Sequence, residues 1–166
     1  MATTAQRKHV VHLLDELYRY RSHLDYPPGD IRTSRDLYWW HLTEQQAMHV
    51  LAGGGRLQAD CSEFVPWVLK CAGLWHWSQP GATSSHVKLL PVYTDAREAY
   101  AGSIVVFGPG GGHHEAIVHT PDHKGGNPLL FSHGRPGVDR VRLHDMQASQ
   151  TAEGHPGVRL LSIAHL

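Results

Sequence analysis

The chain has 166 residues, and its 15 Lys and Arg residues balance its 15 Asp and Glu residues, so the formal net charge is zero with histidine neutral. That length suits one domain with a sizeable core. Balanced charge without a basic run argues against a nucleic-acid partner, because such binders concentrate positive charge on one face. The first thirty residues lack the pattern of a secretory leader, and no apolar run is long enough to span a membrane. We therefore expect a soluble protein made in the cytoplasm, with no nucleic-acid or membrane partner.

Residues 1–58 predict a helical scaffold. Apolar residues at helical spacing indicate an amphipathic helix over 4–22, which the Pro-rich turn at 26–30 ends. Residues 43–46 have the pattern of a capping box and open a second helix that runs to Leu51, before three glycines. The aromatic residues at 38–40 are expected to pack against the core, because large aromatics are buried far more often than they bind ligands.

The second part, residues 59–166, predicts one further helix followed by strands. The helix is expected from Cys61 to Ala72, and Pro66 inside it predicts a kinked or late first turn. After a loop at 78–86, short apolar runs between turn residues predict an antiparallel meander. These runs are 103–107, 115–119, 129–133, 138–143 and 158–164. Helices followed by strands predict the α+β class, in a single domain of residues 1–166.

Only two cysteines occur, Cys61 and Cys71. On one helix they would lie roughly 15 Å apart by helical rise, too far for a disulfide, so at least one thiol is free. Cys61 stands at a helix start, where the dipole and unpaired N–H groups favour the thiolate. A thiol nucleophile also needs a base and a group that orients this base. His114 follows a glycine turn and His133 ends the next apolar strand, so these two histidines are candidates for the base and for the group that orients it.

The 15 histidines also suggest a metal site. The closest pattern to a zinc-protease motif begins at His114 and places its second histidine, His119, at i+5 instead of i+4. On a strand this spacing points the two rings to opposite faces. A metal site with His113, His114 and His133 as ligands is therefore kept only as an alternative, and the preferred interpretation needs no metal or organic cofactor.

Three motifs carry a family resemblance. Asp60-Cys61-Ser62-Glu63-Phe64-Val65 resembles the opening motif of the NlpC family of papain-like cysteine peptidases, which cleave cell-wall peptides. Residues 101–107 followed by 112–118 resemble two strands of that family, and Leu130-Phe131-Ser132-His133-Gly134 resembles the strand whose histidine orients the base. The resemblance spans residues 60–143. It implies a papain-like NlpC-type fold in which a nucleophile helix packs on a mainly antiparallel sheet, with 59–166 as the catalytic core.

Carried over residue by residue, the resemblance implies that Cys61 is the nucleophile, His114 the general base and His133 the residue that orients His114. His113 is the competing candidate for the base and a candidate substrate contact. Asp60 and Ser62 are expected to bind the amino end of the peptide, although Asp60 also suits a helix cap.

Two further features of the sequence bear on the substrate. Trp75 and the loop after it are expected to form one wall of the substrate groove, with a surface cover over the core as the alternative. Glu63 stands where the family usually has glycine, and residues 53–59 hold no counterpart of the aromatic residue that often precedes its Asp-Cys pair. The Asp-Cys-Ser-Glu variant and the His-His turn resemble small peptidase domains of actinobacterial phages.

These features predict a cysteine peptidase or amidase that hydrolyses an amide bond in peptidoglycan peptides through an acyl-enzyme intermediate. It would act as a phage lysin or tail-associated enzyme, on the wall after release from the cell or within a phage particle. Two alternatives come from other classes. One is a catalytically silent papain-like module with a structural or wall-binding role, and the other is the histidine-rich metal-binding protein.

Overall fold

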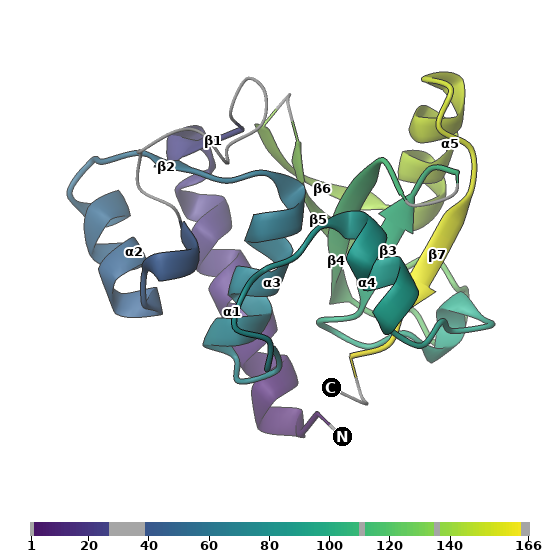
Figure 1. Cartoon of the computed structure of the whole chain (residues 1–166), viewed down its shortest axis with the longest axis horizontal. Helices are drawn as coiled ribbons and strands as arrows, with labels where there is room; N and C mark the ends of the chain where they lie inside the picture. Colours follow the sequence, from purple (N-terminus) through teal and green to yellow (C-terminus); the bar gives the residue numbers. More distant parts are fainter. Residues whose placement is uncertain (1, 27–38, 110–111, 135–136, 164–166) are drawn as a thin grey trace.

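The structure, a computed structural model, describes residues 2–26, 39–109, 112–134 and 137–163. Figure 1 shows helices gathered beside a five-stranded sheet. Helices dominate the first half of the chain and strands the second, so the predicted α+β class is confirmed. Within the described ranges, no helix combines the length and the apolar character needed to cross a membrane.

Helix α1 spans Thr4–Arg19 and begins with a capping box. The Thr3 hydroxyl accepts the Gln6 backbone N–H, and the Gln6 side chain accepts the Thr3 N–H. The apolar stripe that the spacing predicted is buried and consists of Val10, Leu13, Leu14 and Leu17. The predicted helix over 4–22 is therefore confirmed, with its last turn formed by the 3₁₀ helix η1, Arg21–His23.

A two-stranded parallel sheet joins two distant segments and was not predicted. Strand β1, Leu24–Asp25, pairs with strand β2, Leu57–Gln58. The Arg56 guanidinium strengthens the pairing by donating to the Asp25 carboxylate at 2.6 Å. The Pro-rich turn predicted after this strand lies at residues outside the described ranges, except for Tyr26 at its start.

The second helical region consists of the 3₁₀ helix η3, Trp39–His41, and helix α2, Glu44–Ala52. The predicted capping box is present, because the Thr43 hydroxyl accepts the Gln46 N–H at 3.2 Å. Trp39 is completely buried, as the aromatic pattern predicted. Tyr38, the other end of that aromatic group, lies outside the described residues.

Helix α3 spans Cys61–Cys71 and is the central helix of the molecule. It begins at Cys61 and continues through Pro66, so the predicted late start is wrong. Most of the helix is buried, and Phe64 links it to its neighbours. The Phe64 ring stacks on Phe131 of the sheet at a centroid distance of 5.5 Å and meets Trp39 edge to face at 5.3 Å.

The five-stranded sheet is antiparallel throughout, in the order β6-β5-β4-β3-β7. Its strands are β3 (Ile104–Phe107), β4 (His114–Thr120), β5 (Leu129–Gly134), β6 (Gly137–Arg142) and β7 (Val158–Leu161). The first four strands form the predicted meander. The fifth departs from it, because β7 pairs with β3 at the opposite edge instead of following β6.

Three short elements form inside or beside predicted loops, and one of them connects β6 to β7. Helix α5, Leu143–Ala152, follows β6 and carries the chain across the sheet to the β3 edge. Helix α4, Thr83–Leu89, forms in the segment predicted as a loop, and the 3₁₀ helix η4, Ala96–Glu98, follows it. Helix α4 contacts β7 and so lies at the same edge.

The sheet separates two apolar cores. Helices α1 and α3 pack on one face, where Ile117 and Phe131 join the larger core. Helix α5 packs on the other face, where Phe107, Ala116 and Val118 join the smaller core. Since side chains alternate along a strand, the odd-numbered residues of β4 face α3 and the even-numbered ones face away from it.

Candidate active site

The predicted nucleophile, Cys61, is the first residue of α3. Asp60 caps the helix, because one of its carboxylate oxygens accepts the Glu63 backbone N–H at 2.9 Å and the Ser62 hydroxyl at 2.8 Å. The capping alternative for Asp60 is therefore confirmed. The Cys61 side chain is buried, and both cysteines are free thiols.

The environment of Cys61 favours the thiol over the thiolate. Burial raises its pKa to about 12, and the charges of Glu115 and Asp60 act in the same direction. The prediction that the helix start would favour the thiolate is therefore wrong for the free protein. A neutral thiol of this kind needs a proton acceptor during attack, since the thiolate is the nucleophilic form.

Tyr26 is a site residue that the sequence did not reveal. Its hydroxyl lies 3.9 Å from the Cys61 sulfur, and burial raises the pKa of this phenol well above its usual value. The pairing of β1 with β2 brings Tyr26 there, from a segment far from Cys61 in the chain. No local pattern predicts such a contact, because it depends on two strands of two residues each.

His114 is the first residue of β4 and lies on the face of the sheet that carries Phe107. Its Nε2 and the Ser132 hydroxyl are 2.9 Å apart. Burial lowers the pKa of His114 to about 4, so the imidazole is neutral at physiological pH. Among the hydrogen bonds of the described residues, none joins His114 to Cys61. Its role as general base remains a prediction.

His133 lies on the α3 face and is held by the backbone. Its Nε2 donates to the carbonyl oxygens of Ala59 at 2.8 Å and Asp25 at 3.1 Å. A carbonyl can only accept, so the proton is on Nε2, and the buried Nδ1 has no hydrogen-bond partner among the residues that the structure describes. The structure thus differs from the expected orienting role: Ser132, and not His133, bonds to His114. His133 instead fixes the segment that leads into Cys61.

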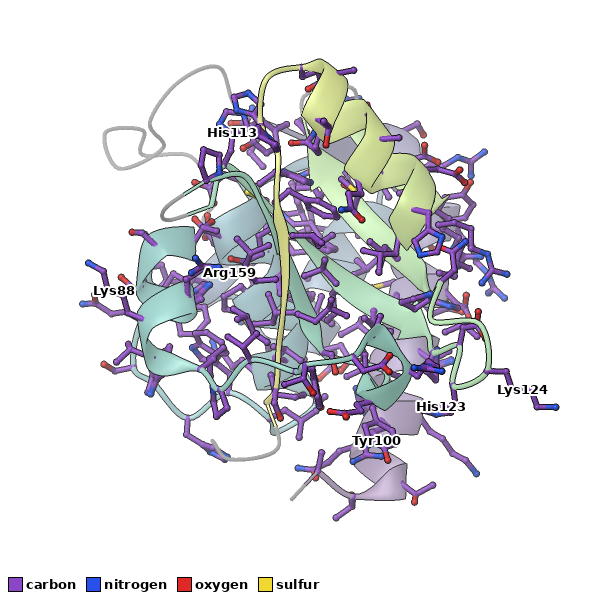
Figure 2. All side chains as sticks on the ribbon, turned by 90° about the vertical axis from the view of Figure 1, so that its right-hand side faces the viewer. Lys88, Tyr100, His113, His123, Lys124 and Arg159 are labelled. Atoms are coloured by element: carbon purple, nitrogen blue, oxygen red, sulfur yellow. The ribbon has the colours of Figure 1, made fainter. Side chains whose placement is uncertain are left out.

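Two predicted substrate contacts lie elsewhere. His113 stacks on His155 with ring centroids 3.4 Å apart, and Figure 2 shows it at the end of the sheet where β7 begins. Trp75 is buried, and its indole N–H donates to the Gln79 carbonyl at 3.1 Å. The prediction that Trp75 itself lines the groove is therefore wrong. It packs behind the loop that does so.

A pocket of about 640 Å³ lies at the start of α3, lined by residues on either side of Cys61 and not by Cys61 itself. Its lining includes Asp60, Ser62 and Glu63 from the start of α3, Trp40 and His41 from η3, and the loop of residues 78–82. This loop forms one wall, as the sequence predicted. Burial raises the pKa of Glu63 to about 7. Asp60 and the partly protonated Glu63 are the acidic groups of the lining, so the pocket favours a cationic ligand.

The described residues contain no group of three or more His, Cys, Asp and Glu side chains arranged to hold a metal ion. The three histidines of the metal alternative are directed differently. His113 stacks on His155, His114 bonds to Ser132 and His133 bonds to backbone carbonyls. Comparison with models of protein families, with curated proteins and with solved structures gave no significant match.

Gly112 is required by the tight packing of the turn that leads into β4. Its φ is +79°, and a Cβ there would lie 2.7 Å from Thr83 Cγ2 and closer still to Val106 Cγ1. We expect Gly112→Ala to lower the free energy of unfolding by about 2–4 kcal/mol, because strain and overpacking add.

Gly154→Ala is the matched control for Gly112. Gly154 has a similar φ of +89°, but no atom lies within 4 Å of the Cβ that the substitution would add. It should therefore cost only the conformational strain, about 1 kcal/mol. Urea unfolding of the two variants measures the difference. Equal losses of stability would show that the contacts at Gly112 do not matter.

Proposed function

We propose that this protein is a cysteine hydrolase of papain-like NlpC type that cleaves an amide bond in the peptides of peptidoglycan. The observation that carries the proposal is the position of Cys61 at the capped start of a buried helix, between Asp60 and Ser62, which both line a pocket. The motif resemblance around Asp60-Cys61-Ser62 supplies the substrate class. The packing of this helix on an antiparallel sheet is what such a fold requires.

In this proposal the Cys61 sulfur attacks the carbonyl carbon, and the thiol proton passes to the neutral His114 imidazole. His114 then protonates the leaving amine, and water hydrolyses the thioester. Backbone N–H groups at the start of α3 are available to the developing oxyanion. In the free protein the imidazole lies on the face of β4 that points away from α3, so this step requires His114, the first residue of the strand, to turn toward the thiol when substrate fills the pocket.

The pocket suits the amino end of a wall peptide. Asp60 and Ser62 belong to its lining, as the resemblance implies, and Glu63 adds a second carboxylate. An ammonium group would be attracted by both carboxylates, and the hydroxyl offers a further acceptor. As a lysin or tail-associated enzyme of a phage, the protein would meet this substrate after release from the cell or from within a phage particle.

A second candidate function is a silent module with a structural or wall-binding role. Two observations favour it: the raised pKa of Cys61, and the absence of a hydrogen bond between Cys61 and His114 among those of the described residues. Activity separates the two candidates directly, because a silent module would bind the wall without changing it.

The test is mass spectrometry of purified actinobacterial peptidoglycan after incubation with the protein. We expect new fragments, whose masses identify the bond that is cleaved. Complete alkylation of Cys61 by iodoacetamide, verified from the mass of the protein, should abolish their release, whereas a chelator should leave it unchanged, because a thiol mechanism needs no metal. A wall identical to the untreated sample would contradict the hydrolase proposal for this substrate, and inhibition by the chelator alone would favour the metal alternative.

A further inference from the structure

Glu63 is a buried carboxylic acid of the pocket lining that has no cationic partner in the described part of the chain. It lies in the first turn of α3, and only 7% of the residue is exposed. Its Oε1 accepts the Trp40 backbone N–H at 3.0 Å. None of the ion pairs between described residues involves it. Burying a carboxylate without a cation is unfavourable, so its presence calls for an explanation.

A structural role accounts for one oxygen of Glu63 only. The bond from Trp40 fixes η3 to the start of α3, and a neutral amide would accept it as well. The other oxygen, Oε2, accepts no hydrogen bond from a described residue, yet it is not sealed from solvent. Since Glu63 belongs to the lining, this oxygen is open to the pocket. The NlpC family usually has glycine at this position, so the resemblance does not explain the carboxylate.

Trp40 is the aromatic residue of the same lining, and it is held in place from several sides. Its indole N–H donates to the Ser78 carbonyl at 3.1 Å, which ties η3 to the loop that forms one wall of the pocket. Its own carbonyl accepts from the Lys70 ammonium at 2.6 Å, and this ammonium also lies 4.6 Å from the ring centroid. Whereas Trp39 is completely buried in the core, Trp40 is only partly buried. The indole is therefore a preorganised apolar surface of the pocket.

The pocket has room and charge for a group besides the amino end of a peptide. Its volume of about 640 Å³ lies within the usual range of small-molecule sites. The other titratable side chains of the lining are Asp60 and His41. Oδ1 of Asp60 is already engaged in the helix cap, where it accepts two hydrogen bonds. A free carboxylate oxygen and an indole in one pocket match a cation carried on an aliphatic chain, since such side chains combine an apolar stem with a charged end.

We propose that Glu63 and Trp40 determine substrate specificity by binding a primary ammonium group at the end of an aliphatic side chain. Glu63 Oε2 accepts a hydrogen bond from the ammonium, and the Trp40 indole packs against the methylene groups. The inference rests on the proposed function, because the ligand is taken as a side chain of the peptide whose amino end lies at Asp60 and Ser62. The protein then prefers a peptide with a side-chain amine over one with an uncharged aliphatic side chain.

The test compares two probes by isothermal titration calorimetry with the whole chain at about pH 8. Nα-acetyl-lysine methylamide carries the ammonium, whereas the side chain of Nα-acetyl-norleucine methylamide ends in a methyl group. Both α-amines are blocked, so neither probe can imitate the amino end of a peptide. At this pH the lysine amine is charged, and the Glu63 carboxyl, whose pKa burial raises to about 7, is mostly ionised. We expect the lysine probe to bind about 10- to 100-fold more tightly, the range for a hydrogen bond to a charged group.

Three variants assign this preference to its residues. Glu63→Gln keeps an acceptor for the Trp40 N–H and removes the charge, so only the lysine probe should lose affinity, by about 10- to 100-fold. Trp40→Ala keeps the backbone N–H that Glu63 accepts and should weaken both probes. Glu98→Gln is the matched control, because it removes the same charge from η4, outside the pocket lining, and should behave like the parent.

Equal affinity of the parent for the two probes, or binding of neither, would overturn the proposal. An unchanged preference in Glu63→Gln with native circular dichroism would also overturn it, as would an equal loss in Glu98→Gln. None of these titrations involves bond cleavage, so the outcome is separate from that of the hydrolase test. A lysine preference without release of wall fragments would contradict the hydrolase proposal alone, and fragment release without a lysine preference would contradict this one alone.

Discussion

Cys61→Ala is expected to abolish the release of fragments from peptidoglycan, with a loss of at least about 10,000-fold in rate. The variant keeps the helix start intact, because the cap is made by the Asp60 side chain and the Glu63 backbone and does not involve the sulfur. The side chain is buried in contact with the Tyr26 hydroxyl, so removing it leaves only a small cavity. The expected loss is therefore chemical and not structural.

Cys71→Ala is the matched control for this prediction. Cys71 ends the same helix, is partly buried and is likewise a free thiol, but lies far from the pocket lining. We expect the variant to retain activity. The measurement compares fragment yields and thermal unfolding of both variants with the parent. If folded Cys61→Ala still released fragments, the Cys61 thiol would not be the nucleophile. The resemblance to the NlpC family would then give no information on function.

Features fixed by neighbours in sequence could be predicted from the sequence. The capping boxes at Thr3 and Thr43, the start of α3 at Cys61 and the turn between β4 and β5 depend on residues within a few positions of one another. The Asp60 cap belongs to the same class. Local hydrogen bonds and periodicity determine such features, so a single sequence is sufficient to locate them.

Contacts between distant segments could not be predicted in this way. Tyr26 reaches Cys61 through a pairing of two-residue strands, and His86 reaches Glu115 from a helix in a segment with turn composition. The position of β7 depends on α5, whose apolar pattern is weak. The face on which His114 lies depends on the register of β4, which a strand motif alone leaves open.

The three histidines near the start of β4 differ in what the structure provides for a base. His113 is stacked on His155 at the end of the sheet. His133 has a buried lone pair on Nδ1 and holds the backbone before Cys61. His114 has one nitrogen fixed by Ser132, and its lowered pKa of about 4 leaves the ring unprotonated at neutral pH but makes it a weak proton acceptor in the free protein. Alanine substitutions at the three histidines should therefore affect activity and stability differently.

His114→Ala is expected to lower kcat/KM on wall peptides by about 100- to 10,000-fold, the range for loss of a general base. Alkylation of Cys61 without substrate should change little, because no hydrogen bond joins the two side chains in the described structure of the free protein. The parent should keep its kcat/KM down to about pH 4, where protonation of His114 removes the base and the rate falls. His113→Ala should be close to the parent throughout.

His133→Ala should instead lower the free energy of unfolding by about 1–3 kcal/mol, together with activity, because the buried Ala59 carbonyl loses the N–H of His133 and the Asp25 carbonyl keeps only the Ala59 N–H. Kinetics and urea unfolding of the three variants separate these roles, because only His114→Ala should lose turnover under conditions in which the variant is still fully folded. The opposite result, an active His114→Ala and a stable but inactive His133→Ala, would transfer the role of base to His133. That outcome would follow the geometry, since His133 is the histidine on the face of the sheet that packs against α3.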